Sequence, residues 1–200
     1  GREVEEKSEF NLLTSKERVD RIIEQSQFYN CDDGNIRGLV FCSKVEVAKE
    51  LSRQFNQRGF KSISLSGESS EEQRSDAIDA LESDDNAEKI DYIFTVDIFN
   101  EGIDIPRVNQ IVMLRPTKSS IIFIQQLGRG LRKVDGKSYL TVIDFIGNYE
   151  NNYLIPIALY GDTSYNKDSL RKLITEGSRM IPGASTIDFD EITKERIFQS

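Results

Sequence analysis

The sequence predicts an α/β fold in which helices cover both faces of a parallel sheet. Three observations support this prediction: short apolar runs, helical patterns between them, and polar residues where the runs end. β-Branched and aromatic residues mark the runs as strands, which lie at Ile36–Cys42, Lys61–Leu65, Ile90–Val96, Val108–Leu114 and Ser138–Phe145. Strands that alternate with helices at this spacing are joined by crossover connections, and crossovers make a sheet parallel.

Capping residues and apolar stripes place the helices. The first is expected over Ser15–Phe28, and Gly59 is expected to end the second. The expected caps, in chain order, are Thr14 with Glu17, Ser43 with Glu46, Ser70 with Gln73, and Ser119 or Ser120 after Pro116. The expected inward-facing residues are Val45, Ala48, Leu51 and Phe55 on the second helix and Ala77, Ile78 and Leu81 on the third.

The pattern divides the chain into three parts. Residues 1–34 form a charged helical lead-in, residues 35–150 form the sheet domain, and residues 151–200 lose the strand–helix alternation. We expect this last part to be a mostly helical extension, with one helix over Asn166–Glu176, and to continue into a further domain.

Composition excludes several classes of function. The 200 residues are 38% hydrophobic and 30% charged, which is typical of a soluble globular protein. Histidine is absent and the two cysteines are Cys31 and Cys42, so a Cys/His zinc site and a histidine base are excluded. No apolar run is long enough to span a membrane, and the N-terminus does not look like a signal peptide. We expect a cytoplasmic, monomeric protein that holds no metal itself.

Polar residues follow the predicted strands at their carboxyl ends. Ser43 and Lys44 follow the first strand, Ser66 and Gly67 follow the second, and Thr95 ends the third. In parallel sheets the carboxyl ends of the strands meet at one edge, and ligands bind there. The net charge of −8 repels nucleic acid, so any nucleic-acid binding at this edge needs a local patch or another domain.

The loop after Thr95 suits a ligand. Gly102 permits backbone amides to approach it closely, and Asp104 can accept hydrogen bonds from a sugar hydroxyl. The hydroxyl of Thr95 is suited to a phosphate. A capped connecting turn would equally explain Gly102 and Pro106, so this loop alone leaves both interpretations open.

The strongest signal lies between Gln125 and Arg132. Arg129 and Arg132 are three residues apart, so they share one face of a helix, and Gly128 leaves room for a backbone or ligand beside them. Guanidinium groups are planar, permanently charged and bidentate toward oxyanions, which suits phosphate. A solvated basic turn at a helix end explains these residues as well when they are considered alone.

Taken together, these elements resemble the second, C-terminal RecA-like domain of superfamily 2 helicases. Motif VI of that family, Gln-x-x-Gly-Arg-x-x-Arg, is matched by Gln125–Arg132 at every fixed position. Gly38–Ser43 is similar to motif IV, Leu65–Glu68 to the turn after the next strand, and Thr95–Pro106 to motif V. The resemblance covers roughly Ile36 to Tyr149, and Val142–Phe145 is most similar to the type III restriction and DNA-repair-like branch.

The resemblance implies a role for each candidate residue. ATP would bind between two RecA-like domains, and Arg129 and Arg132 would be the arginine fingers that reach its γ-phosphate. The residues expected to approach the nucleotide are Gly102, Asp104, Gln125 and Gly128. The residues expected to contact the backbone of a single strand, with DNA favoured over RNA, are Ser43, Lys44, Ser66, Gly67 and Thr95.

The phosphate-anchoring half of such a motor is not recognisable here. Gly136-Lys137-Ser138 imitates a phosphate loop, but Leu131 stands where its first glycine is required. Asp190-Glu191 imitates a Mg²⁺-binding box, but no apolar strand leads into it. We therefore expect Mg²⁺ to be held by an N-terminal RecA-like domain of the same protein, and these 200 residues alone to hydrolyse no ATP.

Two other functions remain open. A non-catalytic module that binds nucleic acid or protein could use the same fold as a scaffold, although a retired site has no need of an arginine pair. A Rossmann-like enzyme would require Gly-x-Gly-x-x-Gly after the first strand, where Cys42-Ser43-Lys44 stands instead.

Overall fold

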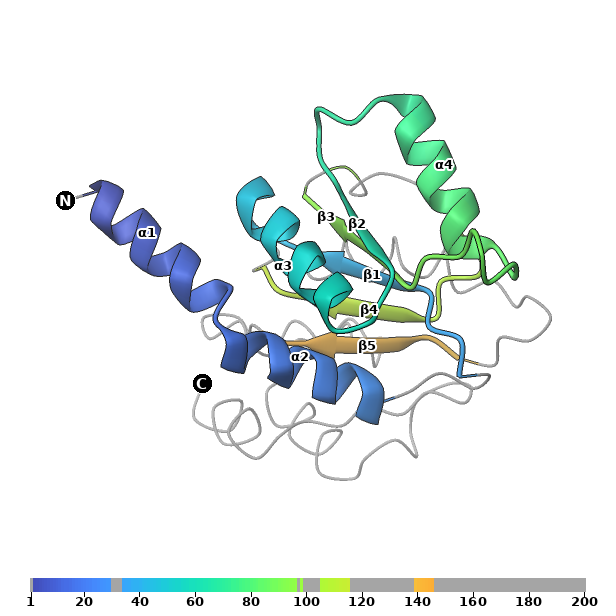
Figure 1. Cartoon of the computed structure of the whole chain (residues 1–200), viewed down its shortest axis with the longest axis horizontal. Coiled ribbons are helices and arrows are strands. Elements are labelled where there is room, and N and C mark those ends of the chain that lie inside the picture. The colour runs from blue at the N-terminus through green and yellow to red at the C-terminus, as the bar shows by residue number, and fades with distance from the viewer. Residues whose placement is uncertain (1, 30–33, 97, 99–104, 116–138, 146–200) are drawn as a thin grey trace, which may run out of the picture. The chain divides into compact units, whose positions relative to one another are not determined.

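The computed structural model describes residues 2–29, 34–96, 98, 105–115 and 139–145, all of which belong to one compact unit. Five parallel strands form a single sheet in the order β2-β3-β1-β4-β5. The strands are β1 (Gly38–Phe41), β2 (Ser62–Leu65), β3 (Tyr92–Thr95), β4 (Gln110–Met113) and β5 (Thr141–Asp144) (Figure 1). The predicted parallel sheet is confirmed, and each strand is shorter than its apolar run because pairing ends before the run does.

Four helices accompany these strands in the described part of the chain. They are α1 (Arg2–Leu13), α2 (Lys16–Phe28), α3 (Val45–Gln57) and α4 (Glu71–Glu82). The hydroxyl of Ser70 accepts a hydrogen bond from the amide of Gln73, whose side chain returns one to Ser70, so the predicted capping box of α4 is confirmed. Arg58 caps the end of α3, and Gly59 follows it with a φ of 90°, so the predicted end of this helix is also confirmed.

Two predicted caps are wrong. The hydroxyl of Ser15, not that of Thr14, caps α2 by accepting from the amide of Arg18, while the Thr14 hydroxyl donates to the carbonyl of Phe10 at 2.8 Å. Lys44, not Ser43, is the N-cap residue of α3, and its side chain makes no capping hydrogen bond. The side chain of Lys44 is therefore available for other contacts.

The helices α2 and α3 cover the same face of the sheet (Figure 1). Val19 and Ile22 of α2 and Ala48, Leu51 and Phe55 of α3 form one apolar cluster with this face. The strand residues in that cluster alternate along their strands and include Val40, Tyr92, Phe94 and Val112. Because α2 contributes fully buried residues to this cluster, it packs as part of the sheet domain.

The alternate strand residues point to the opposite face of the sheet. They include Leu39, Ile93 and Ile111, all of which are buried. The connection through α3 runs outward from β1 to β2, and the connection through α4 returns from β2 to β3. Right-handed crossovers in opposite directions place their helices on opposite faces. Ala77 and Leu81 of α4 are accordingly buried outside the cluster made by α2 and α3.

A buried polar contact fixes the end of α2 against the sheet. The hydroxyl of Tyr92 donates to the side-chain oxygen of Gln110 at 2.8 Å, and the amide group of Gln110 donates to the carbonyl of Ser26 at 2.8 Å. Gln110 is fully buried, and these bonds satisfy both ends of its side chain. Among the described helices, none is both long and apolar enough to cross a membrane.

Candidate nucleic-acid interface

The strand register brings the carboxyl ends of the five strands to one level. Thr95 of β3 lies opposite both Phe41 of β1 and Leu65 of β2. Met113 of β4 lies opposite Phe41, and Asp144 of β5 lies opposite Met113. The segments that follow these residues therefore start from one edge of the sheet, as the sequence predicted.

Ser43 and Lys44 lie at this edge, between the end of β1 and the start of α3. Ser43 is exposed, and Lys44 retains 38% of its side-chain exposure. The ammonium of Lys44 lies 2.7 Å from a carboxylate oxygen of Glu9 in α1. This hydrogen bond is the main reason that the pKa of Lys44 lies above its usual value, which already makes the group a cation near neutral pH.

The segment Ser66–Ser69, which we call the β2 loop, is held by its own hydrogen bonds. The amide of Ser66 donates to the hydroxyl of Ser69 at 3.0 Å, and the hydroxyl of Ser66 accepts from the amide of Glu68 at 3.3 Å. The guanidinium of Arg74, in α4, donates to the carbonyl of Gly67 at 3.2 Å. Arg74 of α4 thus orients the β2 loop, and the hydroxyls of Ser66 and Ser69 form hydrogen bonds within the loop.

Gly67 is exposed within the β2 loop. A β-carbon added at Gly67 would meet no atom within 4 Å, and its φ is not in the positive range. The described structure therefore tolerates a side chain at this position. Because glycine has no side chain, the exposed backbone of Gly67 is open to close approach by a ligand.

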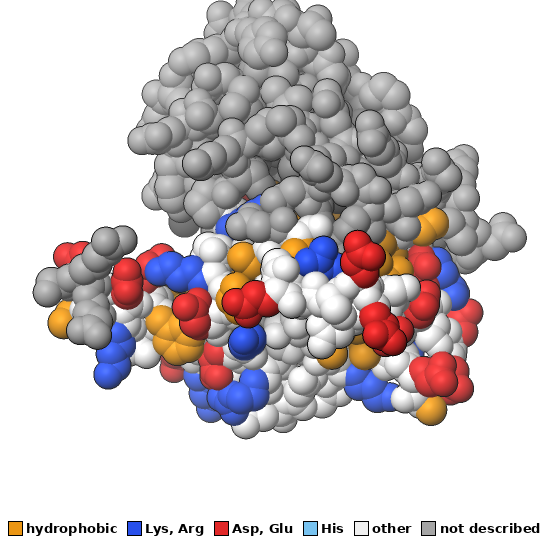
Figure 2. All heavy atoms as spheres, turned by 90° about the horizontal axis from the view of Figure 1, so that it is seen from above, with side chains coloured by type: hydrophobic (Ala, Val, Ile, Leu, Met, Phe, Trp, Pro, Cys, Tyr) orange, Lys and Arg blue, Asp and Glu red, His pale blue; other side chains and the backbone are white. Residues whose placement is uncertain are grey.

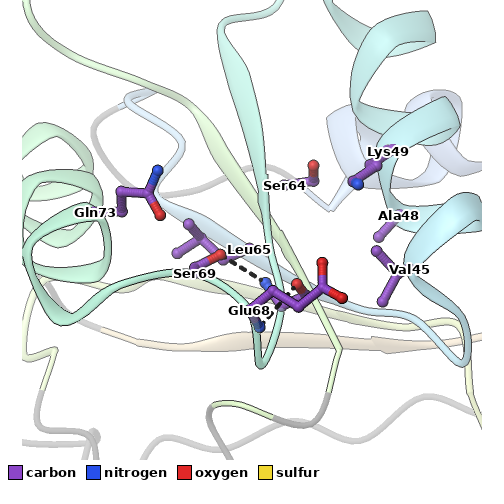
Figure 3. A pocket seen from close by; sticks show the side chains of 9 residues that line it. Val45, Ala48, Lys49, Ser64, Leu65, Glu68, Ser69 and Gln73 are labelled. Atoms are coloured by element: carbon purple, nitrogen blue, oxygen red, sulfur yellow. Dashed lines mark hydrogen bonds between the residues drawn. The ribbon is translucent and has the colours of Figure 1, made fainter.

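A small hollow lies beside the β2 loop. It has a volume of about 140 Å³ and lies between the start of α3 and the start of α4 (Figure 3). Ala48 and Lys49 of α3 form one side, Gln73 of α4 lies across from them, and Ser64 and Ser69 add hydroxyls. This hollow makes the edge next to Gly67 concave and polar.

Two of the predicted contact residues do not present their hydroxyls to solvent. Ser66 is buried and bonded within the β2 loop, and Thr95 has 0% exposure. The Thr95 hydroxyl has no hydrogen-bonding partner among the described residues. It lies directly before the predicted nucleotide loop, at the end of a central strand, so a buried polar group suited to phosphate stands where that loop begins.

The six residues predicted to face the nucleotide are Gly102, Asp104, Gln125, Gly128, Arg129 and Arg132, and all lie outside the described residues. The same holds for the helix expected after Pro116 and for the extension at 151–200. These remain predictions. Within the described ranges, no group of three or more Cys, Asp or Glu side chains is arranged to hold a metal ion.

Charge is mixed over the described surface. Figure 2 shows acidic and basic side chains interspersed over the described part of the face in view, in keeping with the net charge of −8. Among the described residues in this region, Lys44 is a cation that could attract a polyanion.

Sequence reasoning missed two side chains that touch the site. Glu9 pairs with Lys44 from 35 positions away, and no local pattern could have indicated this pair. Arg74 follows the capping residue Gln73 by one position, and only the folded loop shows that it holds the carbonyl of Gly67.

The family follows from a comparison with known proteins. Residues 15–134 match the family model described as the helicase conserved C-terminal domain, and this chain belongs to that family. The recognition of a superfamily 2 helicase C-terminal domain from its motifs is confirmed. The matched region includes both arginines of the predicted motif VI and every predicted nucleic-acid contact.

Several curated proteins are similar over this region. The chain is 26% identical over 138 residues to the putative ATP-dependent helicase IRC3 of Saccharomyces cerevisiae, covering 68% of this chain and 19% of that protein. It is 32% identical over 124 residues to the ATP-dependent RNA helicase SrmB of Haemophilus influenzae, covering 62% and 27%. It is 28% identical over 200 residues to the UvrABC system protein B of Methanosphaera stadtmanae, covering 90% and 30%. The chain thus spans less than a third of each of these relatives.

Solved structures agree with the fold. The crystal structure of T4 UvsW is 25% identical, with a TM-score of 0.50 over 69% of this chain and 27% of that one. The DNA-bound ATP-dependent Type ISP restriction-modification enzyme LlaBIII is 22% identical, with a TM-score of 0.57 over 90% of this chain and 14% of that one. The predicted RecA-like architecture is confirmed by the described five-stranded sheet and these likenesses.

Proposed function

We propose that this chain is the C-terminal motor domain of an ATP-dependent superfamily 2 helicase or translocase. The observation that supports this proposal is the level edge of the sheet, where Lys44 is partly exposed and Gly67 is exposed beside the end of β3. The family model covers that edge together with Arg129 and Arg132. The relatives named as ATP-dependent helicases make ATP the nucleotide in this proposal.

Arg129 and Arg132 are the proposed arginine fingers. ATP would supply the phosphoryl group whose transfer to water releases energy, and Mg²⁺ would be held with it by an N-terminal RecA-like domain of a longer protein. The two guanidinium groups would then neutralise negative charge that develops on the γ-phosphate, an effect worth about 10³–10⁵ in rate. Gly102, Asp104, Gln125 and Gly128 would line the same site. The buried hydroxyl of Thr95, which has no hydrogen-bonding partner among the described residues, lies at the end of β3 just before this loop and is suited to a phosphate of either ATP or nucleic acid.

Nucleic acid is the proposed track, contacted through its backbone. Ser43 and Gly67 are exposed, so phosphates can reach them without rearrangement, whereas Lys44 is partly exposed and paired with Glu9. Ser66 and Thr95 are buried, so their proposed contacts require a rearrangement that exposes their hydroxyls. We favour DNA because Val142–Phe145 is most similar to the restriction and repair branch, while the RNA helicase SrmB among the relatives makes RNA the alternative track.

The finger assignment is tested in a protein that also contains the nucleotide-anchoring domain. Arg129→Ala and Arg132→Ala should each lower ATP turnover by about 10³-fold or more, with no loss of folding. Arg53→Ala is the matched control, because Arg53 is an exposed arginine of α3 that pairs only with Glu50 of the same helix among the described residues. Turnover that stays unchanged in both finger variants would leave the non-catalytic module as the better account.

The track is tested on the 200-residue chain itself. Fluorescence anisotropy with labelled single-stranded DNA and RNA should show weak binding that weakens further as salt rises, because phosphate contacts release counterions. Tight binding that does not respond to salt would contradict backbone contacts by a few cations. Stronger binding of RNA than of DNA would reverse the proposed preference.

A further inference from the structure

The cation at the proposed nucleic-acid edge already has an anionic partner within the chain. The ammonium of Lys44 lies 2.7 Å from Glu9, and both side chains remain partly exposed, at 38% and 51%. Neither group is sealed from solvent. A phosphate could therefore approach Lys44, but it would find the ammonium already paired with the carboxylate of Glu9.

The helix that carries Glu9 is anchored next to it. Phe10 and Leu13 pack against the apolar cluster of the sheet domain. The carbonyl of Thr14 accepts a hydrogen bond of 2.7 Å from the side chain of Gln54 in α3. Figure 1 shows the rest of α1 projecting away from the sheet. Glu9 is thus held at Lys44 by the docked end of an otherwise exposed helix.

The charges around Lys44 favour retention of the cation and oppose a second anion. Glu9, Glu6 and Glu46 all act on Lys44 electrostatically, and Glu6 lies one turn before Glu9 on α1. A nucleic-acid phosphate must enter this acidic environment. The contact between Lys44 and phosphate therefore competes with Glu9 directly and with Glu6 and Glu46 through space.

We propose that α1 is an electrostatic latch, in which Glu9 occupies Lys44 and must be displaced before Lys44 can bind the phosphate backbone of a single strand. This inference rests on the proposed function, because it gives Lys44 a phosphate to bind. It assigns a regulatory role to a helix that lies outside residues 15–134, the region matched by the helicase family model. Nucleic acid and α1 are alternative partners of one ammonium group.

The latch is weak by construction. Exposed ion pairs contribute little, so release of Lys44 should tighten binding by about two- to fivefold. An ion pair this weak between Glu9 and Lys44 can be broken by any event that moves α1 or adds phosphate contacts elsewhere. The effect lies within the precision of anisotropy titrations at low salt.

The test is a double-mutant cycle on the 200-residue chain, with labelled oligothymidylate and oligouridylate as probes. Glu9→Gln removes the carboxylate charge, and Lys44→Ala removes its partner. Glu24→Gln is the matched control, because Glu24 is an exposed residue of the neighbouring helix α2 and loses the same charge. Each substitution is then repeated in the Lys44→Ala background. Thermal melting checks that the variants fold alike.

The latch predicts that Glu9→Gln tightens binding about two- to fivefold more than Glu24→Gln does, and that the difference vanishes without Lys44. If Lys44→Ala weakens binding but Glu9→Gln and Glu24→Gln behave alike, the latch is wrong and the proposed contact stands. If Glu9→Gln keeps its excess effect without Lys44, Glu9 acts elsewhere and the latch is also wrong. If no variant binds either probe, or Lys44→Ala binds like the wild type, the proposed contact fails and the latch fails with it.

Discussion

Gly38 at the start of β1 lies directly against the ring of Tyr92 in β3. A β-carbon added at Gly38 would be 2.3 Å from Cδ1 and 2.4 Å from Cε1 of that ring. The ring cannot easily withdraw, because its hydroxyl donates to Gln110 and its faces and edges meet Phe55 and Phe60. The first residue of the motif IV stretch is therefore a packing glycine.

Replacement of Gly38 by alanine should destabilise the domain. The added methyl group must push Tyr92 out of a filled core, and overpacking of this kind costs about 1–3 kcal/mol. Urea denaturation measures the loss in the free energy of unfolding. A variant as stable as the wild type would mean that the ring relocates without cost.

Replacement of Gly67 by alanine should leave stability unchanged but lower the affinity for single strands. No atom lies within 4 Å of the added β-carbon, so stability should change by less than about 0.5 kcal/mol. If the backbone of Gly67 approaches a phosphate, single-strand affinity should fall by about three- to tenfold, which corresponds to one lost hydrogen bond. Anisotropy measures the affinity, and an unchanged value would argue against contact at Gly67.

Asp84 should contribute stability that acid removes. Its two carboxylate oxygens both accept from Nη2 of Arg107, at 2.7 and 2.8 Å, and one of them also accepts from Arg37 at 2.7 Å. The hydrogen bonds from Arg107 are the main reason that the pKa of Asp84 lies below its usual 3.8. A depressed pKa gives stability that is present above the unfolded value and lost as pH falls through the lower folded value.

The free energy of unfolding of the wild type should therefore fall more steeply below about pH 4 than that of Asp84→Asn. Denaturation at a series of pH values makes the comparison. Asp76→Asn removes an exposed carboxylate from α4 and serves as the control. Parallel acid profiles for the wild type and Asp84→Asn would show that the pair between Arg107 and Asp84 does not persist in solution.

Cys42 should be chemically silent in the folded domain. Burial raises the pKa of its thiol to about 12, against opposing effects from Arg115 and Arg18. The folded protein keeps the neutral thiol, while the unfolded chain ionises from its ordinary value of 9.0, so stability should fall as pH rises between 9.0 and about 12.

Alkylation by iodoacetamide measures this protection. In a Cys31→Ser background, labelling of Cys42 at about pH 8 should follow the population of unfolded protein, because the reactive species is an accessible thiolate. Denaturant should accelerate labelling in step with the unfolded fraction. Labelling at the rate of a free thiol under native conditions would contradict the buried environment.

Short-range sequence signals predicted much of the fold, and the wrong predictions concern single residues at helix starts. The cap of α4 could be predicted because Ser70 and Gln73 contact each other within one turn. At the start of α2 two adjacent hydroxyls compete, and the sequence does not show that Thr14 bonds backward to Phe10 and leaves Ser15 as the cap. The side chain of Ser43 likewise loses its expected role because α3 starts one residue later.

The candidate site divides in the same way. The sequence placed Lys44, Gly67 and Thr95 at one edge, and the strand register confirmed that β1, β2 and β3 end at one level. It did not show that Thr95 is buried or that Arg74 orients the β2 loop. Exposure and loop geometry depend on neighbours that are distant in the chain.

By itself, the sequence determined the parallel sheet, the order of its motifs and the family, because strand periodicity and motif spacing are properties of short segments. Only the tertiary structure decided that Glu9 reaches Lys44 and that Tyr92 fills the space above Gly38. Those contacts join residues that are 35 and 54 positions apart in the sequence, and packing of the whole domain brings them together.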